Sequence, residues 1–132
     1  MAKLIHTMIR VQDLDRSLRF YDGALGLSIS HRLDFDDFSL VYLRNAENDF
    51  EIELTWNKGR ETPYGHGDGY GHVAVVVDDV GRERQRLLDL GLNPNDVREF
   101  RDKEGALLAR YFFIQDPDGY KIEVLERHGH YS

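Results

Sequence analysis

Residues 51–54 read Glu-Ile-Glu-Leu and residues 121–124 read Lys-Ile-Glu-Val, so similar phrases occur near the end of each half of the chain. Each half also begins with a histidine in an apolar stretch: His6 in KLIHTMIRV (3–11) and His72 in YGHVAVVV (70–77). Adding 66 to the number of the first histidine gives the number of the second. An internal repeat of this kind predicts two copies of one structural module.

The elements between these landmarks follow the same order in both halves. In the first half, an alternating strand precedes a helix that starts at Asp13 and ends at Gly26, and three strands separated by polar turns follow. In the second half, a helix that opens at Asp78 and Asp79 ends at Gly91. The predicted strands are residues 3–11, 27–33, 38–44 and 50–56, then 70–77, 97–100, 107–115 and 120–126. The sequence therefore predicts an α+β fold built from two β-α-β-β-β modules.

The domain organisation follows from the length and from one polar stretch. The 132 residues suit a single domain, 1–132. We expect module 1 at about residues 1–57, a Gly-rich linker at about 58–69 and module 2 at about 70–127. A lone module of this size would be marginally stable, so the two modules should depend on each other.

The composition argues against several classes of function. The net charge is −7, whereas nucleic-acid binding needs a concentrated positive surface, so nucleic acid is not expected as a partner. The chain has no cysteine, so any thiol in the chemistry must come from a substrate. No apolar signal segment opens the sequence, and its longest apolar runs are far too short to span a bilayer. We therefore expect a cytoplasmic protein without a membrane partner.

The repeated histidines and glutamates are the candidate metal ligands: His6, Glu53, His72 and Glu123. Side chains alternate between the faces of a strand, so each of the four is expected on the face opposite the apolar residues. Symmetric pairing of the modules would bring two imidazoles and two carboxylates together. That set suits one Zn²⁺, Ni²⁺, Co²⁺ or Mn²⁺ ion with positions left for water or substrate. A single such residue on a strand is usually structural or exposed, but four that match across a repeat are rarely accidental.

Arg10 and Asn57 are candidate substrate-binding residues. Arg10 follows His6 by four residues, and Asn57 follows Glu53 by four, each on the same strand face as its ligand. Four residues of a strand span about 13 Å. A guanidinium beside an amide can hold the carboxylate and amine of an α-amino acid. The alternative interpretation is a surface arginine and a turn asparagine.

Four segments carry a resemblance to a known family: residues 6–11 (HTMIRV), 52–57 (IELTWN), 70–73 (YGHV) and 116–123 (DPDGYKIE). Together, over essentially the whole chain, they resemble bacterial glyoxalase I of the vicinal oxygen chelate superfamily. The resemblance implies curved sheets of the glyoxalase/bleomycin-resistance type and a homodimer with shared active sites. It also implies one divalent ion per site at the four candidate ligands, with Ni²⁺ favoured and Zn²⁺ or Co²⁺ as alternatives.

The same resemblance implies an activity. Members of the family are lyases that isomerise the hemithioacetal of methylglyoxal and glutathione to S-lactoylglutathione, which detoxifies methylglyoxal. Glutathione would be the co-substrate, and Arg10 and Asn57 would contact its γ-glutamyl end. Glu123 would be the general base that removes the proton from the carbon bearing sulfur, while Glu53 would remain a ligand.

One position departs from the family pattern. Longer members carry an arginine just before the Gly-aromatic-Gly-His phrase, where this chain has Asp68. Arg101, Lys103 and Arg110 are the candidates to hold the glycine carboxylate of glutathione in its place.

Three other functions stay open on the same scaffold: an epimerase, a ring-cleaving dioxygenase, and a non-catalytic ligand-sequestering protein of the bleomycin-resistance kind. Dioxygenases of this superfamily use two histidines and one carboxylate around iron, so a second glutamate argues against that activity. The related epimerases tend to carry glutamine where this chain has Glu53. Sequestering proteins lack the metal ligands altogether.

Overall fold

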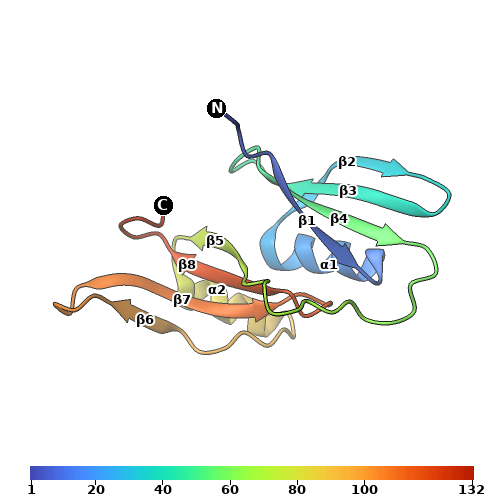
Figure 1. Ribbon diagram of the computed structural model, residues 1–132. Helices are drawn as coiled ribbons and strands as arrows, with labels where there is room; N and C mark the ends of the chain where they lie inside the picture. Colours follow the sequence, from blue (N-terminus) through green and yellow to red (C-terminus); the bar gives the residue numbers. More distant parts are fainter. The chain divides into compact units, whose positions relative to one another are not determined.

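The computed structural model describes all of residues 1–132 and divides them into two compact units, Met1–Gly65 and His66–Ser132 (Figure 1). The division falls inside the polar stretch that the sequence marks as a linker. Each unit contains one four-stranded sheet and one helix in the order β-α-β-β-β. The predicted α+β fold of two such modules is confirmed, and neither sheet closes on itself.

The first unit consists of β1 (His6–Val11), α1 (Leu14–Leu25), β2 (Ser28–Asp34), β3 (Phe38–Arg44) and β4 (Glu51–Asn57). The strand order across its sheet is β1-β4-β3-β2. β1 runs parallel to β4, whereas the β3–β4 and β2–β3 pairs are antiparallel. The last strand of the unit therefore lies beside the first, which brings together residues that are far apart in the sequence.

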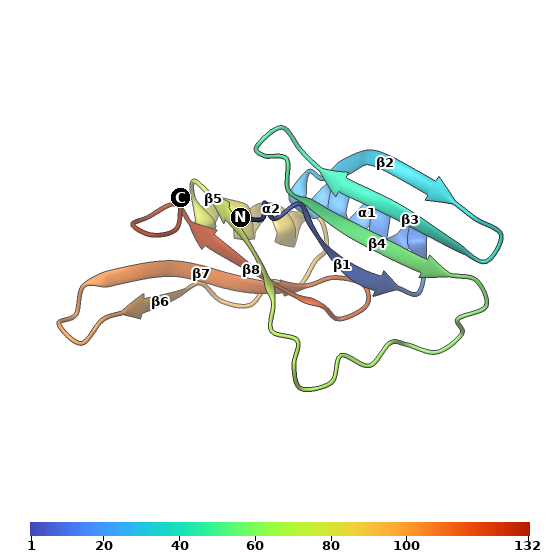
Figure 2. The ribbon, with the colours of Figure 1, turned by 45° about the horizontal axis from the view of Figure 1, so that its top comes forward.

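Local sequence signals fix both ends of α1. The Asp13 side chain accepts a hydrogen bond from the Arg16 amide at 3.1 Å, as an N-cap residue does. Gly26 ends the helix with a φ of 65°, a left-handed conformation that glycine adopts without a Cβ clash. The helix covers one face of the sheet (Figure 2), and its buried side packs toward the apolar residues of the strands.

The alternation of side chains separates the two faces of this sheet. Val11, Val41 and Leu54 are completely buried on the apolar face. His6 and Glu53 lie on the other face, as the sequence predicts, because strand neighbours point in opposite directions. Glu53 is nevertheless only 8% exposed, so its carboxylate is held within the unit and does not face open solvent.

The second unit repeats this arrangement with β5 (Val73–Val77), α2 (Val80–Asp89), β6 (Arg98–Arg101), β7 (Leu107–Gln115) and β8 (Lys121–Glu126). Its strand order is β5-β8-β7-β6, with β5 parallel to β8 and the other pairs antiparallel. As in α1, an aspartate caps the helix: Asp79 accepts from the Arg82 amide at 3.0 Å. Neither helix has both the length and the apolar character that crossing a membrane requires.

Two strands begin three residues later than the sequence predicts, and the bounds of the other strands agree with the prediction to within one residue. β1 begins at His6 and not at residue 3, because its partner β4 begins at Glu51, which pairs with His6. β5 begins at Val73 and not at residue 70, because its pairing with β8 begins with Ile122 opposite Val73. His72 therefore lies immediately before its strand, whereas His6 lies within one. The short strand predicted at residues 97–100 is found one residue later, at Arg98–Arg101.

Candidate metal-binding and active site

The first unit brings His6 and Glu53 into direct contact. Nε2 of His6 lies 3.1 Å from Oε2 of Glu53. The other carboxylate oxygen, Oε1, accepts a hydrogen bond of 3.0 Å from the hydroxyl of Tyr42. Tyr42 is opposite Glu53 in the antiparallel register of β3 and β4, and its ring meets the His6 imidazole edge to face at 5.6 Å. Both oxygens of Glu53 therefore have a partner within the unit.

The Tyr42 hydroxyl is held in its donor form. Burial, and then the hydrogen bond to the Glu53 carboxylate, raise the pKa of Tyr42 above its usual value. The phenol therefore remains protonated at neutral pH and keeps donating to Glu53. Sequence reasoning missed this residue, because a tyrosine within an apolar strand looks like an ordinary β-forming residue.

The second unit contains the equivalent pair in a looser arrangement. Nε2 of His72 lies 3.7 Å from Oε1 of Glu123. Phe113 is opposite Glu123 in the register of β7 and β8, and its ring meets the His72 imidazole edge to face at 5.3 Å. Phe113 thus occupies the place that Tyr42 has in the first unit, but it brings no hydroxyl to the glutamate.

The geometry of both pairs fits chelation of a divalent ion. An ion bonded at about 2.1 Å to a nitrogen and an oxygen separates them by about 3.0 Å at a right angle and about 3.4 Å at a tetrahedral angle. The two observed separations, 3.1 Å and 3.7 Å, lie close to these values. Imidazole nitrogen and carboxylate oxygen are also the donors that Zn²⁺ and its neighbours accept. Each pair therefore fits one half of a metal site.

Neither unit brings together three or more histidine or acidic side chains that could hold a metal on its own. A single pair supplies two donors, and a catalytic site of this type usually has three or more protein ligands. The four candidate ligands are thus placed as two separate pairs, His6 with Glu53 and His72 with Glu123.

Arg10 and Asn57 repeat the relation that His6 has to Glu53. His6 pairs with Glu51, two residues before Glu53 on β4; Arg10 pairs with Thr55, two residues before Asn57. Both side chains therefore belong to the ligand-bearing face, further along the same two strands. The amide of Asn57 donates to the Tyr64 hydroxyl at 3.2 Å.

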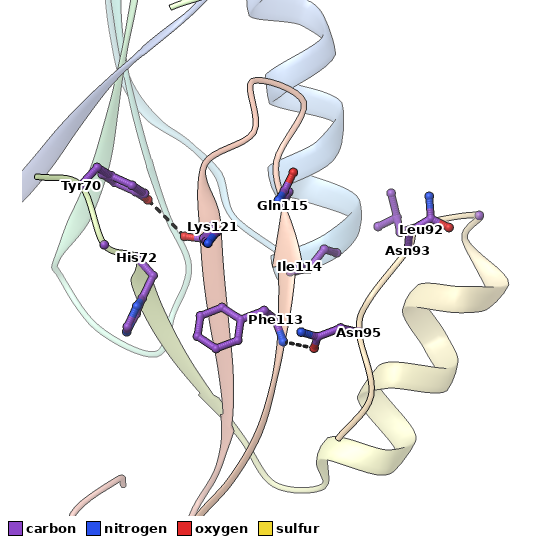
Figure 3. Close-up of a pocket in the computed structure, with 11 residues that line it drawn as sticks. Tyr70, His72, Leu92, Asn93, Asn95, Phe113, Ile114, Gln115 and Lys121 are labelled. Carbon is purple, nitrogen blue, oxygen red and sulfur yellow. Dashed lines mark hydrogen bonds between the residues drawn. The ribbon is translucent and has the colours of Figure 1, made fainter. Parts of the chain in front are cut away.

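A hollow of about 750 Å³ adjoins His72 in the second unit. Figure 3 shows His72 and Phe113 on one side of it, with Asn95 and Lys121 nearby. The hydroxyl of Tyr70 donates to the backbone oxygen of Lys121 at 3.1 Å, and the Asn95 side chain accepts from the Phe113 amide at 2.7 Å. These contacts fix the walls of the hollow beside the imidazole.

The basic residues of the second unit differ in their ion-pair partners and in the face of the sheet on which they lie. Arg110 contacts Glu126, which accepts a hydrogen bond from the first amide of α2, so both lie on the helix-covered face opposite Glu123. Arg101 pairs with Glu99 on β6. Arg98, which the sequence analysis did not single out, pairs in register with Tyr111 and so shares the face of Glu123.

Comparisons with known proteins agree with this architecture. The family model of the Glyoxalase/Bleomycin resistance protein/Dioxygenase superfamily matches residues 3–124. A lactoylglutathione lyase of Haemophilus influenzae is 38% identical over 128 residues, covering 94% of this chain and 92% of that protein. A probable lactoylglutathione lyase of Synechocystis sp. is 40% identical over 129 residues, covering 93% and 94%.

Solved structures give the same result for the fold. The Leishmania major glyoxalase I, described as trypanothione-dependent, is 35% identical, with a TM-score of 0.76, and the match covers 96% of this chain and 87% of that one. Glyoxalase I from Zea mays is 29% identical with a TM-score of 0.81, and the match covers 96% of this chain and 45% of that longer one. The chain belongs to the glyoxalase/bleomycin resistance protein/dioxygenase superfamily.

Proposed function

We propose that this protein is a lactoylglutathione lyase, which isomerises the hemithioacetal of methylglyoxal and glutathione to S-lactoylglutathione. The observation that carries the proposal is the pair of His–Glu contacts at equivalent places in two copies of one module. Relatives with 38–40% identity over more than nine-tenths of this chain bear that enzyme name. Glutathione is accordingly the proposed co-substrate.

The proposed metal site joins the two pairs, His6 with Glu53 and His72 with Glu123. A divalent ion bound there supplies Lewis-acid stabilisation of the negative charge that develops on the substrate oxygens. Ni²⁺ is the favoured ion, and Zn²⁺ and Co²⁺ are alternatives. The chain has no cysteine, so all its ligands are nitrogen and oxygen donors, which suit these ions.

Glu123 is the proposed general base. Its carboxylate has one partner, His72 at 3.7 Å, whereas Glu53 has two closer ones. The less constrained carboxylate is better able to reach the substrate carbon, take its proton and return the proton to the neighbouring carbon. Glu53 stays in place as a ligand.

Two regions are proposed to bind the peptide backbone of glutathione, one at each end of the molecule. Arg10 and Asn57, which lie further along the face that carries His6, bind its γ-glutamyl end. Arg98 offers a positive charge on the face of Glu123, where a carboxylate at the other end would be attracted. This placement favours Arg98 over Arg110, because Arg110 lies on the opposite face with Glu126.

The identity of the thiol is proposed from the relatives. The Leishmania major relative is described as dependent on trypanothione, a thiol other than glutathione. We propose glutathione for this chain, since the curated relatives are named for it. The protein is further proposed to act in the cytoplasm as a homodimer, with each site formed by the first unit of one chain and the second unit of its partner.

The decisive experiment measures the activity of purified protein before and after chelation. The hemithioacetal of methylglyoxal and glutathione is the substrate, and Ni²⁺, Co²⁺ and Zn²⁺ are added back separately to the apo-protein. We expect activity to disappear with the chelator and to return with at least one ion. Full activity in metal-free protein would contradict the metal site. Metal binding without any turnover of this substrate would point to the epimerase, whereas protein with neither metal binding nor turnover would point to the ligand-sequestering alternative.

A further inference from the structure

The two units differ by one hydroxyl beside their glutamates. Tyr42 is opposite Glu53 in register, and Phe113 is opposite Glu123. We propose that the Tyr42 hydroxyl is the positioning group that keeps Glu53 a fixed metal ligand, and that its absence at Phe113 leaves Glu123 free to act as the base. This inference rests on the proposed function and explains how two equivalent carboxylates take different roles.

The two aromatic rings occupy equivalent positions. The Tyr42 ring meets His6 with a centroid distance of 5.6 Å and an interplanar angle of 76°. The Phe113 ring meets His72 at 5.3 Å and 81°. Strand register and ring geometry therefore agree between the units, so a hydroxyl added to Phe113 would lie toward Glu123 as the Tyr42 hydroxyl lies toward Glu53.

The surroundings of the two carboxylates differ in the way this proposal requires. Glu53 is held through both oxygens, at 3.1 Å by His6 and at 3.0 Å by Tyr42, and its side chain is 10% exposed. Glu123 has the single contact of 3.7 Å with His72, and its side chain is 18% exposed. A carboxylate with one contact and more exposure can rotate more freely than one with both oxygens engaged.

This difference in freedom matters because ligand and base need opposite properties. A hydrogen bond to the outer oxygen of a ligating carboxylate orients it toward the ion, and losing such a partner typically weakens metal binding about 10- to 100-fold. A base must instead approach the substrate carbon and change its proton state during the reaction. A fixed hydroxyl beside Glu123 would oppose that movement.

Two reciprocal substitutions test the proposal. Tyr42→Phe removes the hydroxyl from the first unit, and Phe113→Tyr adds one to the second. Affinity for Zn²⁺ is measured on apo-protein by competition with a chromophoric chelator, and kcat and KM are measured with the metal-loaded enzyme. We expect Tyr42→Phe to weaken Zn²⁺ binding by about 10-fold or more, and Phe113→Tyr to lower kcat by about 10-fold while KM is kept and Zn²⁺ affinity is kept or strengthened.

Matched controls separate this role from a general effect on folding. Tyr111→Phe removes a hydroxyl from the same face of β7 without changing the register partner of Glu123, so its Zn²⁺ affinity should equal that of the wild type. Circular dichroism and thermal unfolding of each apo-protein check that the sheets are intact. If Tyr42 served only to stabilise the fold, Tyr42→Phe would lower the temperature of thermal unfolding, and its metal affinity and kcat would change together.

The proposal is overturned by an unchanged Zn²⁺ affinity in folded Tyr42→Phe, or by an unchanged kcat in folded Phe113→Tyr. If either variant unfolds, Tyr42→Leu and Phe113→Gln give a second comparison, the first without a hydrogen-bond donor and the second with an amide donor that is not among the usual Zn²⁺ ligands. The Zn²⁺ measurement needs no substrate. Wild-type protein that binds Zn²⁺ but turns over the hemithioacetal with none of Zn²⁺, Ni²⁺ and Co²⁺ would therefore refute the proposed function, while the affinity comparison would still decide the role of Tyr42.

Discussion

The imidazole of His72 is the one partner of the Glu123 carboxylate, with 3.7 Å between Nε2 and Oε1. In the other unit the corresponding carboxylate is shared between an imidazole and a phenol. The two copies of the module thus contain the same histidine–glutamate pair but differ in how tightly each glutamate is held. This asymmetry underlies the assignment of Glu123 as the base.

Replacing Glu123 with glutamine should abolish proton transfer without emptying the metal site. The amide retains an oxygen that can ligate the ion, but it cannot take a proton, and loss of a positioned base typically costs about 10²–10⁴ in rate. The measurements are kcat with the hemithioacetal and metal content by elemental analysis. The control is Glu126→Gln, on the same strand but on the helix-covered face, which should keep its turnover. Near wild-type kcat for Glu123→Gln would show that another residue is the base.

Replacing Arg10 with alanine should raise KM more than it lowers kcat. Arg10 lies four residues along β1 from His6, so we expect it to contact a part of the substrate far from the reacting carbon and to stabilise the bound substrate and the transition state about equally. Steady-state kinetics with varied hemithioacetal concentration measure the two constants. Arg19→Ala, an exposed arginine of α1, serves as the control. An unchanged KM in the Arg10 variant would place the thiol elsewhere.

Two inactive variants should restore activity together if the site is shared between chains. Each sheet ends in an edge strand, β1 in one unit and β5 in the other, and each edge presents unpaired backbone groups that favour association. Glu53→Ala and Glu123→Ala are refolded as a mixture. In a mixed dimer with shared sites, one site has both defects and the other has none. Random mixing makes half of the dimers mixed, so roughly a quarter of wild-type sites should return by two-fold symmetry.

The contrary result of that mixing experiment is equally informative. If all four ligands came from one chain, every site in the mixture would keep one defect and no activity would return. Native mass spectrometry confirms that mixed dimers have formed. An inactive mixture that contains such dimers would rule out shared sites and leave the metal chemistry untouched.

Removing the N-cap of α2 should destabilise the protein without altering its chemistry. Asp79 accepts from the Arg82 amide at 3.0 Å, and loss of such a cap costs about 0.5–2 kcal/mol. Urea denaturation of Asp79→Ala and of the neighbouring Asp78→Ala gives the comparison. Asp78 forms an exposed ion pair with Arg127 at 3.1 Å, and such pairs contribute little to stability. Equal free energies of unfolding for both variants would contradict the role of Asp79.

The sequence predicts most of the fold because its strongest local signals agree with its internal repeat. Asp13 and Gly26 mark the ends of α1 as predicted, and Asp79 caps α2. The first strand of each half is shorter than its apolar pattern suggests, because β1 pairs with β4 only from His6 on and β5 pairs with β8 only from Val73 on. His72 therefore falls just outside its strand, although β8 begins at Lys121.

The surroundings of the candidate ligands depend on register, which the sequence does not reveal. Tyr42 is important only because it pairs with Glu53, and nothing in residues 38–44 marks that tyrosine as different from its apolar neighbours. Residues 107–115 (LLARYFFIQ) are apolar at both odd and even positions, so alternation cannot show which face Arg110 joins. The pairing of β3 with β4 places Tyr42 opposite Glu53, and the pairing of β7 with β6 and β8 settles the face of Arg110.

The parallel pairing of the first strand of each unit with its last also bears on biosynthesis. His6 and Glu53 cannot meet until β4 has left the ribosome, and His72 and Glu123 cannot meet until β8 has followed. Such long-range pairing forms late, because ordering the intervening chain costs entropy before the contacts between the two strands can stabilise it. A unit still being synthesised therefore has no assembled histidine–glutamate pair, and any metal ion that the proposed site binds through both members of a pair must await a finished sheet.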